Sequence, residues 1–414
     1  MQLTIVSIRS AVIRGLGPLP STQGTHSPVD QQCLDSLCTD NIAETFDHDP
    51  SRTIYKRSCI NSDGGCSCTR VADSAGHAAT QSTRSSRSKT VWPYTLSPQE
   101  KRGGKRKQIM TGSVLLLDGG LGQELIHRSA AAPHHLWSLQ VMLDEPQLVS
   151  DIHRDFCRAG AAIACLNTYA ITRARLTRGG VTAPLDTLLL RACELARQGI
   201  EASGKNDVAV VSSLPPLVAS YSPDTELPAN QMVSEYEELI ALQRPHVDGF
   251  LAETIASVNE AIAVLTAAKK SDVRIMLGLT VRDEDGRRLR SGESLEDALA
   301  AIGAFDPLAV VINCSKPEAV SQAMPLLQKS GCPYGGFANG FTAIDALKPG
   351  GVVDVLEART DLGPAAYATH AAAWLDAGAT VIGGCCEVGP DHILALNSLL
   401  EQRGSGRMRW ADLE

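Results

Sequence analysis

Three cysteines offer the clearest chemistry in this sequence. Cys314 ends the apolar run AVVINCS, and the adjacent pair Cys385 and Cys386 ends ATVIGGCC, where two glycines let the backbone approach a ligand closely. Adjacent cysteines are poorly placed to bridge each other, because the eight-membered ring strains the disulfide geometry. Two neighbouring thiolates and a distant third instead suit a zinc site with three sulfur ligands and one open position, which would accept a substrate thiol.

The alternative for any cysteine is burial as a small apolar side chain. We assign that role to the cysteines that lie within apolar stretches, which are Cys157, Cys165, Cys193 and Cys332. For Cys314, Cys385 and Cys386 taken alone, both interpretations stay open. The strands predicted around these three favour the metal site.

Size and composition limit the protein class. The chain has 414 residues, 43% of them hydrophobic, with a net charge of −8, so it can bury one barrel-sized core or two smaller ones and is not basic enough for nucleic acid. No run approaches the roughly 20 apolar residues of a membrane helix. The twelve cysteines do not form one disulfide framework, which favours a reducing compartment. We therefore expect a soluble cytoplasmic protein that binds neither nucleic acid nor membrane.

Residues 1–109 differ from the rest of the chain. STQGTHSP, QSTRSSRSK and KRGGKRKQ are rich in polar and basic residues with little apolar periodicity, which predicts a low-order N-terminal extension without a core. Three interpretations are open: a mitochondrial targeting segment, a zinc module built from its five irregularly spaced cysteines, or an over-extended reading frame with the functional chain starting at Met110. The first would place the protein in mitochondria.

Residues 110–414 alternate short apolar runs with amphipathic stretches. Eight strands are predicted, at 114–119, 162–168, 208–214, 248–254, 275–281, 309–315, 334–339 and 379–386. Helical patterns such as SVNEAIAVLTAAKK and PAAYATHAAAWLDAGA lie between them. Eight strand-then-helix units in about 300 residues predict an α/β fold of the (β/α)8 TIM-barrel type, whose active site lies at the carboxyl ends of the strands.

Polar residues cluster at those carboxyl ends. The candidates are Asp118, Asn167, Thr168, Ser212, Ser213, Glu253, Thr254, Asn313, Cys314, Asn339, Cys385 and Cys386. If the strands close in register, Cys314 and the cysteine pair lie two strands apart on one rim, near enough to share an ion. A rim carboxylate also pairs well with an ammonium group.

The motifs resemble the homocysteine S-methyltransferase family over about residues 113–400. The matching pieces include LLLDGGLGQEL, DGFLAETIASVNEA, VVINCSKPEAV, GGFANG and, most specifically, WLDAGATVIGGCCEVGPDHI. The resemblance implies one Zn²⁺ per chain, bound by Cys314, Cys385 and Cys386 with the substrate thiol as fourth ligand. It further implies that Asp118, Gly119 and Glu253 bind the amino-acid head group of homocysteine, and that Thr168 and Asn339 lie near the substrate.

The resemblance also implies a reaction. Homocysteine would take a methyl group from a cationic donor and become methionine, with S-methylmethionine the first choice of donor, S-adenosylmethionine the second and betaine the third. The segment SSLPPLVASYSPD departs from the GSVGPYG type common in the S-methylmethionine branch. We expect His392 to lie in the first turn of the last helix and Trp137 to pack rather than wall the pocket.

Two further expectations come from this stage. The partners are small-molecule substrates, and the protein is a monomer or small homo-oligomer. The rival to an enzyme is a non-catalytic vicinal-dithiol protein, in which Cys385 and Cys386 respond to oxidants or buffer zinc. That rival explains the cysteines but not Asp118 and Glu253 at the same rim.

Overall fold

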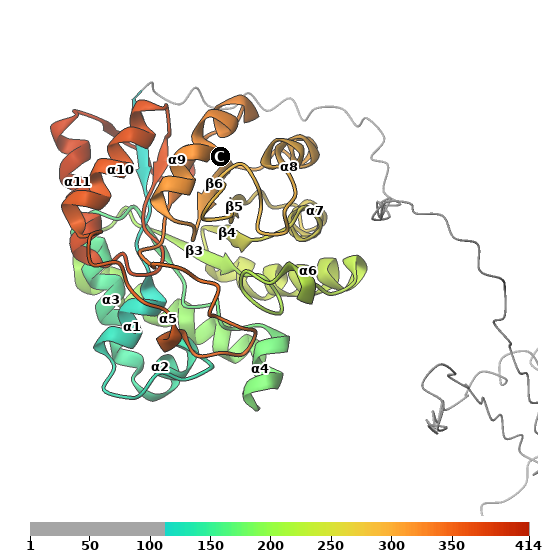
Figure 1. Cartoon of the computed structure of the whole chain (residues 1–414). Coiled ribbons are helices and arrows are strands. Elements are labelled where there is room, and N and C mark those ends of the chain that lie inside the picture. Colours follow the sequence, from blue (N-terminus) through green and yellow to red (C-terminus); the bar gives the residue numbers. More distant parts are fainter. Residues whose placement is uncertain (1–111, 414) are drawn as a thin grey trace, which may run out of the picture. The chain divides into compact units, whose positions relative to one another are not determined.

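A nine-stranded parallel sheet forms the centre of the protein in the computed structural model, which describes residues 112–413 (Figure 1). The strands are β1 Ser113–Leu116, β2 Ile163–Cys165, β3 Ala209–Leu214, β4 Gly249–Ile255, β5 Met276–Leu279, β6 Ala309–Asn313, β7 Tyr334–Phe337, β8 Val381–Ile382 and β9 Gly406–Arg407. All eight predicted strands are present. The predictions for residues 1–109, and the domain boundary at residue 110, lie outside the described residues.

Helices follow the strands and surround the sheet (Figure 1). They are α1 Leu121–Arg128, α2 Ser138–Asp144, α3 Pro146–Ala159, α4 Arg173–Gly179, α5 Leu185–Ser203, α6 Ala229–Gln243, α7 Val258–Lys270, α8 Leu295–Ile302, α9 Pro317–Leu327, α10 Pro364–Asp376 and α11 Pro390–Gln402. Local sequence sets their ends: the Ser257 side chain caps α7 by accepting from the Glu260 N–H, and Gly160 ends α3 in the left-handed conformation. Within the described range, no helix is long and apolar enough to cross a membrane.

The strand order in the curled sheet is β2-β3-β4-β5-β6-β7-β8-β1-β9. Because β2 and β9 are its two end strands, the strand pairing does not confirm a closed barrel. The free edge of β1 pairs with β9 through Ser113 and Val114. One backbone hydrogen bond of 2.8 Å, from Ala162 N to Leu116 O, reaches from β1 to the segment before β2. The strand β9 was not predicted, because two exposed residues carry no alternating apolar pattern.

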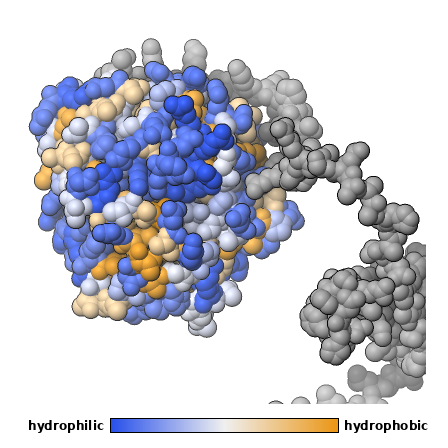
Figure 2. Space-filling model, in the orientation of Figure 1, coloured by the Kyte–Doolittle hydropathy of each residue, from blue (hydrophilic) through white to orange (hydrophobic). Residues whose placement is uncertain are grey.

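Strand alternation divides the core into two layers. Leu116 packs outward among the helices, whereas Leu115 and Leu117 point into the curl of the sheet. Trp410 joins the inner cluster from the C-terminal segment, and its ring lies where a Cβ on Gly249 would be. Figure 2 shows a face that is mostly hydrophilic, with hydrophobic residues gathered on its lower half. The inner cluster also contains Cys314 and Cys385, so the metal-site candidates belong to the interior of the curl.

The buried Tyr367 joins the ends of β7 and β8. Its hydroxyl donates to Gly383 O at 2.8 Å and accepts from Ala338 N at 2.9 Å. We expect Tyr367→Phe to lower the free energy of unfolding by about 1–3 kcal/mol, because it leaves two buried backbone groups without a partner. Urea unfolding of the two proteins measures the difference, and equal midpoints would show that this bridge contributes nothing.

Candidate active site

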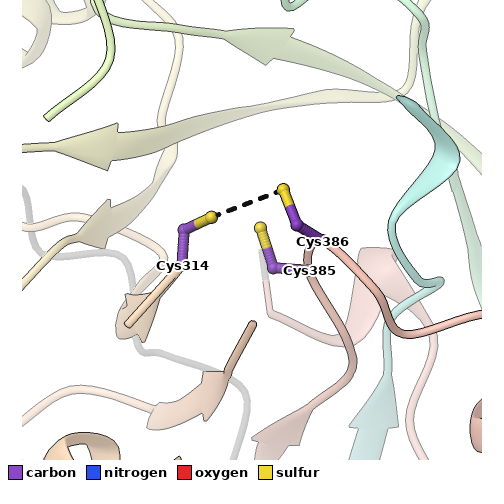
Figure 3. A group of neighbouring side chains, drawn as sticks. All are labelled: Cys314, Cys385 and Cys386. Carbon is purple, nitrogen blue, oxygen red and sulfur yellow. Dashed lines mark hydrogen bonds between the residues drawn. The ribbon is translucent and has the colours of Figure 1, made fainter. Parts of the chain in front are cut away.

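The three predicted metal ligands meet in one place. Cys314 follows the last residue of β6, and Cys385 and Cys386 lie in the turn after β8. Their sulfur atoms all lie within 4.8 Å of one another, with Cys314 Sγ and Cys386 Sγ 3.7 Å apart (Figure 3). A tetrahedral zinc ion with Zn–S bonds of about 2.3 Å sets its sulfur ligands about 3.8 Å apart. The trio therefore fits a three-sulfur zinc site.

Backbone contacts hold the cysteine turn in place. Cys385 N donates to Ala338 O and Gly340 N donates to Cys386 O, each at 2.9 Å. The turn also presses against Gly120, where an added Cβ would lie 2.3 Å from Cys385 O. A glycine is needed at that position because any side chain would displace the turn.

Non-glycine residues with positive φ gather around the same cavity. Trp137, Tyr221, Thr254 and Cys314 have φ between 47° and 61°, and all four line it. Such conformations are uncommon for these residue types and persist only when the surroundings impose them. The surrounding fold therefore holds this site in a strained backbone geometry.

The three thiols influence one another's ionisation. Burial raises the pKa of Cys314, but hydrogen bonds from Cys385, Cys386 and Tyr221 outweigh it and hold the pKa well below the usual range. The Tyr221 hydroxyl lies 2.8 Å from Cys314 Sγ. The hydrogen bond to Cys314 is the main cause that raises the pKa of Cys385 and Cys386 well above the usual range. A cation is needed before all three can be thiolates together.

Two carboxyl groups face the same cavity. Asp118 Oδ2 accepts from Cys165 N at 2.7 Å, and Glu253 Oε1 accepts from Ser213 Oγ at 2.5 Å. Neither carboxyl forms an ion pair with any of the described residues. Burial raises the pKa of Asp118 to about 7 and that of Glu253 to about 8. An ammonium group in the cavity would return both to their charged form.

The raised pKa of Asp118 predicts a pH-dependent stability. Its folded-state pKa of about 7 exceeds the unfolded value of 3.8, so the folded state keeps the proton and stability is lost as pH rises between those values. We expect Asp118→Asn to raise the free energy of unfolding at pH 8 by roughly 2–4 kcal/mol, at about 1.4 kcal/mol per pKa unit, and hardly at all near pH 4. Melting curves at both pH values, in the same metal state, test this. An equal effect at both would contradict it.

Thr168 and Asn339 are buried near the site but do not line the cavity. Thr168 Oγ1 donates to Ser213 O at 2.9 Å, and Asn339 Oδ1 accepts from Phe341 N at 3.2 Å. Asn339 Nδ2 is buried without a partner. These contacts place Thr168 behind Ser213, which holds Glu253. Direct binding of the substrate by Thr168 and Asn339 therefore stays a prediction.

Gly119 and Trp137 line the cavity, and His392 does not. His392 lies in the first turn of α11, as expected, where its Nδ1 accepts from Gly389 N. The expectation that Trp137 only packs is wrong, because its ring walls the cavity. Trp137 Nε1 donates to Gln123 Oε1 at 2.8 Å, and the ring meets Tyr169 edge-on at 5.7 Å.

Tyr169, Arg175 and Tyr221 are among the cavity residues that were not singled out from the sequence. Tyr169 directly follows Thr168 and Tyr221 lies in ASYSPD, but neither has a spacing that marks a site. Tyr169 and Tyr221 extend the aromatic wall begun by Trp137. The cavity thus combines sulfur, carboxyl and aromatic groups.

Comparison with known proteins decides the family. A sequence model of the homocysteine S-methyltransferase family matches residues 115–400. The chain belongs to the homocysteine S-methyltransferase family. The resemblance of its motifs is thereby confirmed, and the protein is a methyltransferase.

Individual members of the homocysteine S-methyltransferase family agree. The homocysteine S-methyltransferase of Escherichia coli (strain K12) is 30% identical over 304 residues, which cover 69% of this chain and 94% of the relative. A selenocysteine Se-methyltransferase from Brassica oleracea var. italica is 26% identical over 321 residues, covering 71% and 91%. The metallated form of the Escherichia coli homocysteine methyltransferase MmuM shares the fold, with a TM-score of 0.59 at 24% identity over 69% of this chain and 96% of that one.

Proposed function

We propose that this family member transfers a methyl group from a sulfonium donor, S-methylmethionine or S-adenosylmethionine, to the thiol of homocysteine and so forms methionine. The observation that carries the proposal is the cavity itself, which Cys314, Cys385 and Cys386 line together with Asp118 and Glu253. The three cysteines alone would also suit a protein that stores zinc. Two carboxyl groups without ion-pair partners suit an amino-acid substrate.

Each group has a role in substrate binding. Asp118 and Glu253 receive the ammonium group of homocysteine, and Gly119 lies beside them at the cavity. The Gly120 N–H donates to Val388 O at 2.9 Å, so it stabilises the turn and is not free to bind the substrate. One zinc ion held by the three sulfur atoms would supply a Lewis acid that keeps the substrate thiol as a reactive thiolate at neutral pH.

The transfer is a direct displacement. The homocysteine sulfur attacks the donor methyl carbon, a new C–S bond forms, and the old C–S bond breaks with its electron pair staying on the donor sulfur. The thiol proton leaves to solvent. Trp137, Tyr169 and Tyr221 line the cavity, and aromatic rings there suit a cationic methyl donor.

We further propose a fold, partners and a location for this enzyme. The curled sheet would act as a (β/α)8 barrel with β9 filling part of the seam beside β1, and the active site would lie at its carboxyl end. Small-molecule substrates would be the partners of a cytoplasmic enzyme that works as a monomer or small homo-oligomer.

The direct test is methionine formation by reduced, zinc-loaded protein. S-methylmethionine, S-adenosylmethionine and betaine are supplied in parallel with homocysteine, and selenocysteine replaces homocysteine in a further arm. We expect turnover with a sulfonium donor, loss of turnover after zinc is removed with a chelator, and recovery when zinc returns. Turnover with betaine alone would overturn the choice of donor. No turnover with any donor, at one zinc per chain, would overturn the function.

A further inference from the structure

Arg175, Arg178 and Lys348 line the cavity with a charge opposite to that of Asp118 and Glu253, and the last two of these three are exposed. Arg175, on helix α4, lines the cavity and is partly buried. No carboxylate among the described residues forms an ion pair with it. Burial lowers the pKa of Arg175, and Glu260, a carboxyl group that acts in the opposite direction, is itself held by Leu217 N and Tyr236 Oη, each at 3.0 Å. A partly buried guanidinium without a counter-ion is costly, so an anionic ligand would be bound favourably.

The hydrogen bonds of Arg175 leave one edge of the guanidinium available. Nη1 donates to Pro216 O at 2.8 Å and to Tyr169 O at 3.2 Å. Nη2 has only a 3.5 Å contact with Ser220 Oγ, and no described residue accepts from Nε. The Nε–Nη2 edge is one that can bind a carboxylate through two parallel hydrogen bonds. Since Nη1 is anchored and the group stands 5.2 Å from the centre of the Tyr169 ring, this edge is held in place.

Arg175 lines the same cavity as the three sulfur atoms. Its contact Ser220 directly precedes Tyr221, whose hydroxyl lies 2.8 Å from Cys314 Sγ. Arg175 and Cys314 thus contact consecutive residues of the cavity wall. A donor that presents its methyl group at the sulfur atoms can therefore turn a carboxylate toward Arg175.

We propose that Arg175 binds the carboxylate of the methyl donor and thereby selects sulfonium amino acids. This inference rests on the proposed function and deepens it. In S-methylmethionine four bonds separate the sulfonium sulfur from the carboxylate carbon, whereas in betaine only two bonds separate nitrogen from that carbon. We expect betaine, with its shorter span, to gain less from Arg175 than S-methylmethionine does. The homocysteine head group is held separately by Asp118 and Glu253.

The test pairs a donor change with a residue change. S-methylmethionine is compared with its decarboxylated analogue, (3-aminopropyl)dimethylsulfonium, in the wild type, Arg175→Lys and Arg175→Met. We expect the wild type to have a donor KM about 10- to 100-fold lower for S-methylmethionine, as for a lost charged hydrogen-bond pair. Both variants should lose most of that preference, while the KM for homocysteine changes less than about 3-fold. Arg173→Met, an exposed arginine on the same helix, is the matched control.

Two outcomes would overturn the inference. One is an equal KM of the wild type for S-methylmethionine and its decarboxylated analogue, which is measured without any variant. The other is an Arg175→Met protein that raises the KM of homocysteine instead of the donor. Calorimetric binding of S-methylmethionine to zinc-loaded protein separates this inference from the function. Arg175-dependent binding without turnover would overturn the proposed reaction alone, and binding that Arg175→Met leaves unchanged would overturn this inference alone.

Discussion

The Cys386→Ser protein should purify without zinc and without methyltransferase activity. Cys386 Sγ lies 3.7 Å from Cys314 Sγ, so the two sulfur atoms would occupy neighbouring positions in the proposed tetrahedron of zinc ligands. A serine hydroxyl does not ionise near neutral pH, so only two thiolates would remain to hold the metal. We expect bound zinc to fall to near zero and methionine formation to drop by about 10³-fold or more, because metal assistance supplies several kcal/mol of the rate.

The effect is measured as the zinc content per chain, by inductively coupled plasma mass spectrometry, and as the rate of methionine formation per chain. Cys332→Ser is the matched control, since Cys332 is a free cysteine that contacts Ser330 and does not line the cavity. It should keep both zinc and activity. A Cys386→Ser protein that retained stoichiometric zinc would remove this cysteine from the ligand set.

Glu253→Gln should separate binding of metal from binding of substrate. Glutamine is nearly isosteric and can still accept from Ser213 Oγ, but it has no charge to pair with an ammonium group. Loss of a buried charge pair costs about 2–5 kcal/mol, so we expect kcat/KM for homocysteine to fall by roughly 10²- to 10³-fold. The zinc content should stay at the wild-type value. Steady-state kinetics and metal analysis of the same preparation test both parts.

This variant also discriminates between an enzyme and a zinc-buffering or redox protein. A vicinal-dithiol protein would need only its cysteines, so Glu253→Gln would leave all its properties unchanged. Glu296→Gln is a suitable control because Glu296 is exposed on α8, and it should behave as wild type. Retention of full methyl transfer by Glu253→Gln would show that the ammonium group is bound elsewhere.

Much of the site could be predicted because each strand pattern fixes where its polar residues end up. A run such as AVVINCS is too apolar to lie at the surface, so Cys314 had to emerge at the end of a buried strand. The same argument placed Asp118, Glu253 and the cysteine pair at the ends of their strands, which parallel pairing then brings to one edge. Apolar periodicity was enough to place these residues at strand ends, and the resemblance to the family implied their roles.

Other features depend on side-chain direction and long-range contacts, which a sequence pattern does not contain. Thr168 follows a buried strand as Asp118 does, yet it turns toward Ser213 O rather than the cavity. Arg175 looks like a surface residue of a short polar helix until Pro216 O and Tyr169 O fix its Nη1.

The sequence by itself therefore determined the family through its motifs, and the eight strands with their helices through local periodicity. The strand ends singled out the candidate site residues, and the resemblance implied their metal and ammonium-binding roles. Only the tertiary structure decided how the free edge of β1 pairs, which aromatic side chains wall the cavity, and which edge of Arg175 is left for a ligand. Each of these depends on contacts between segments distant in the chain, and such contacts leave no local signature.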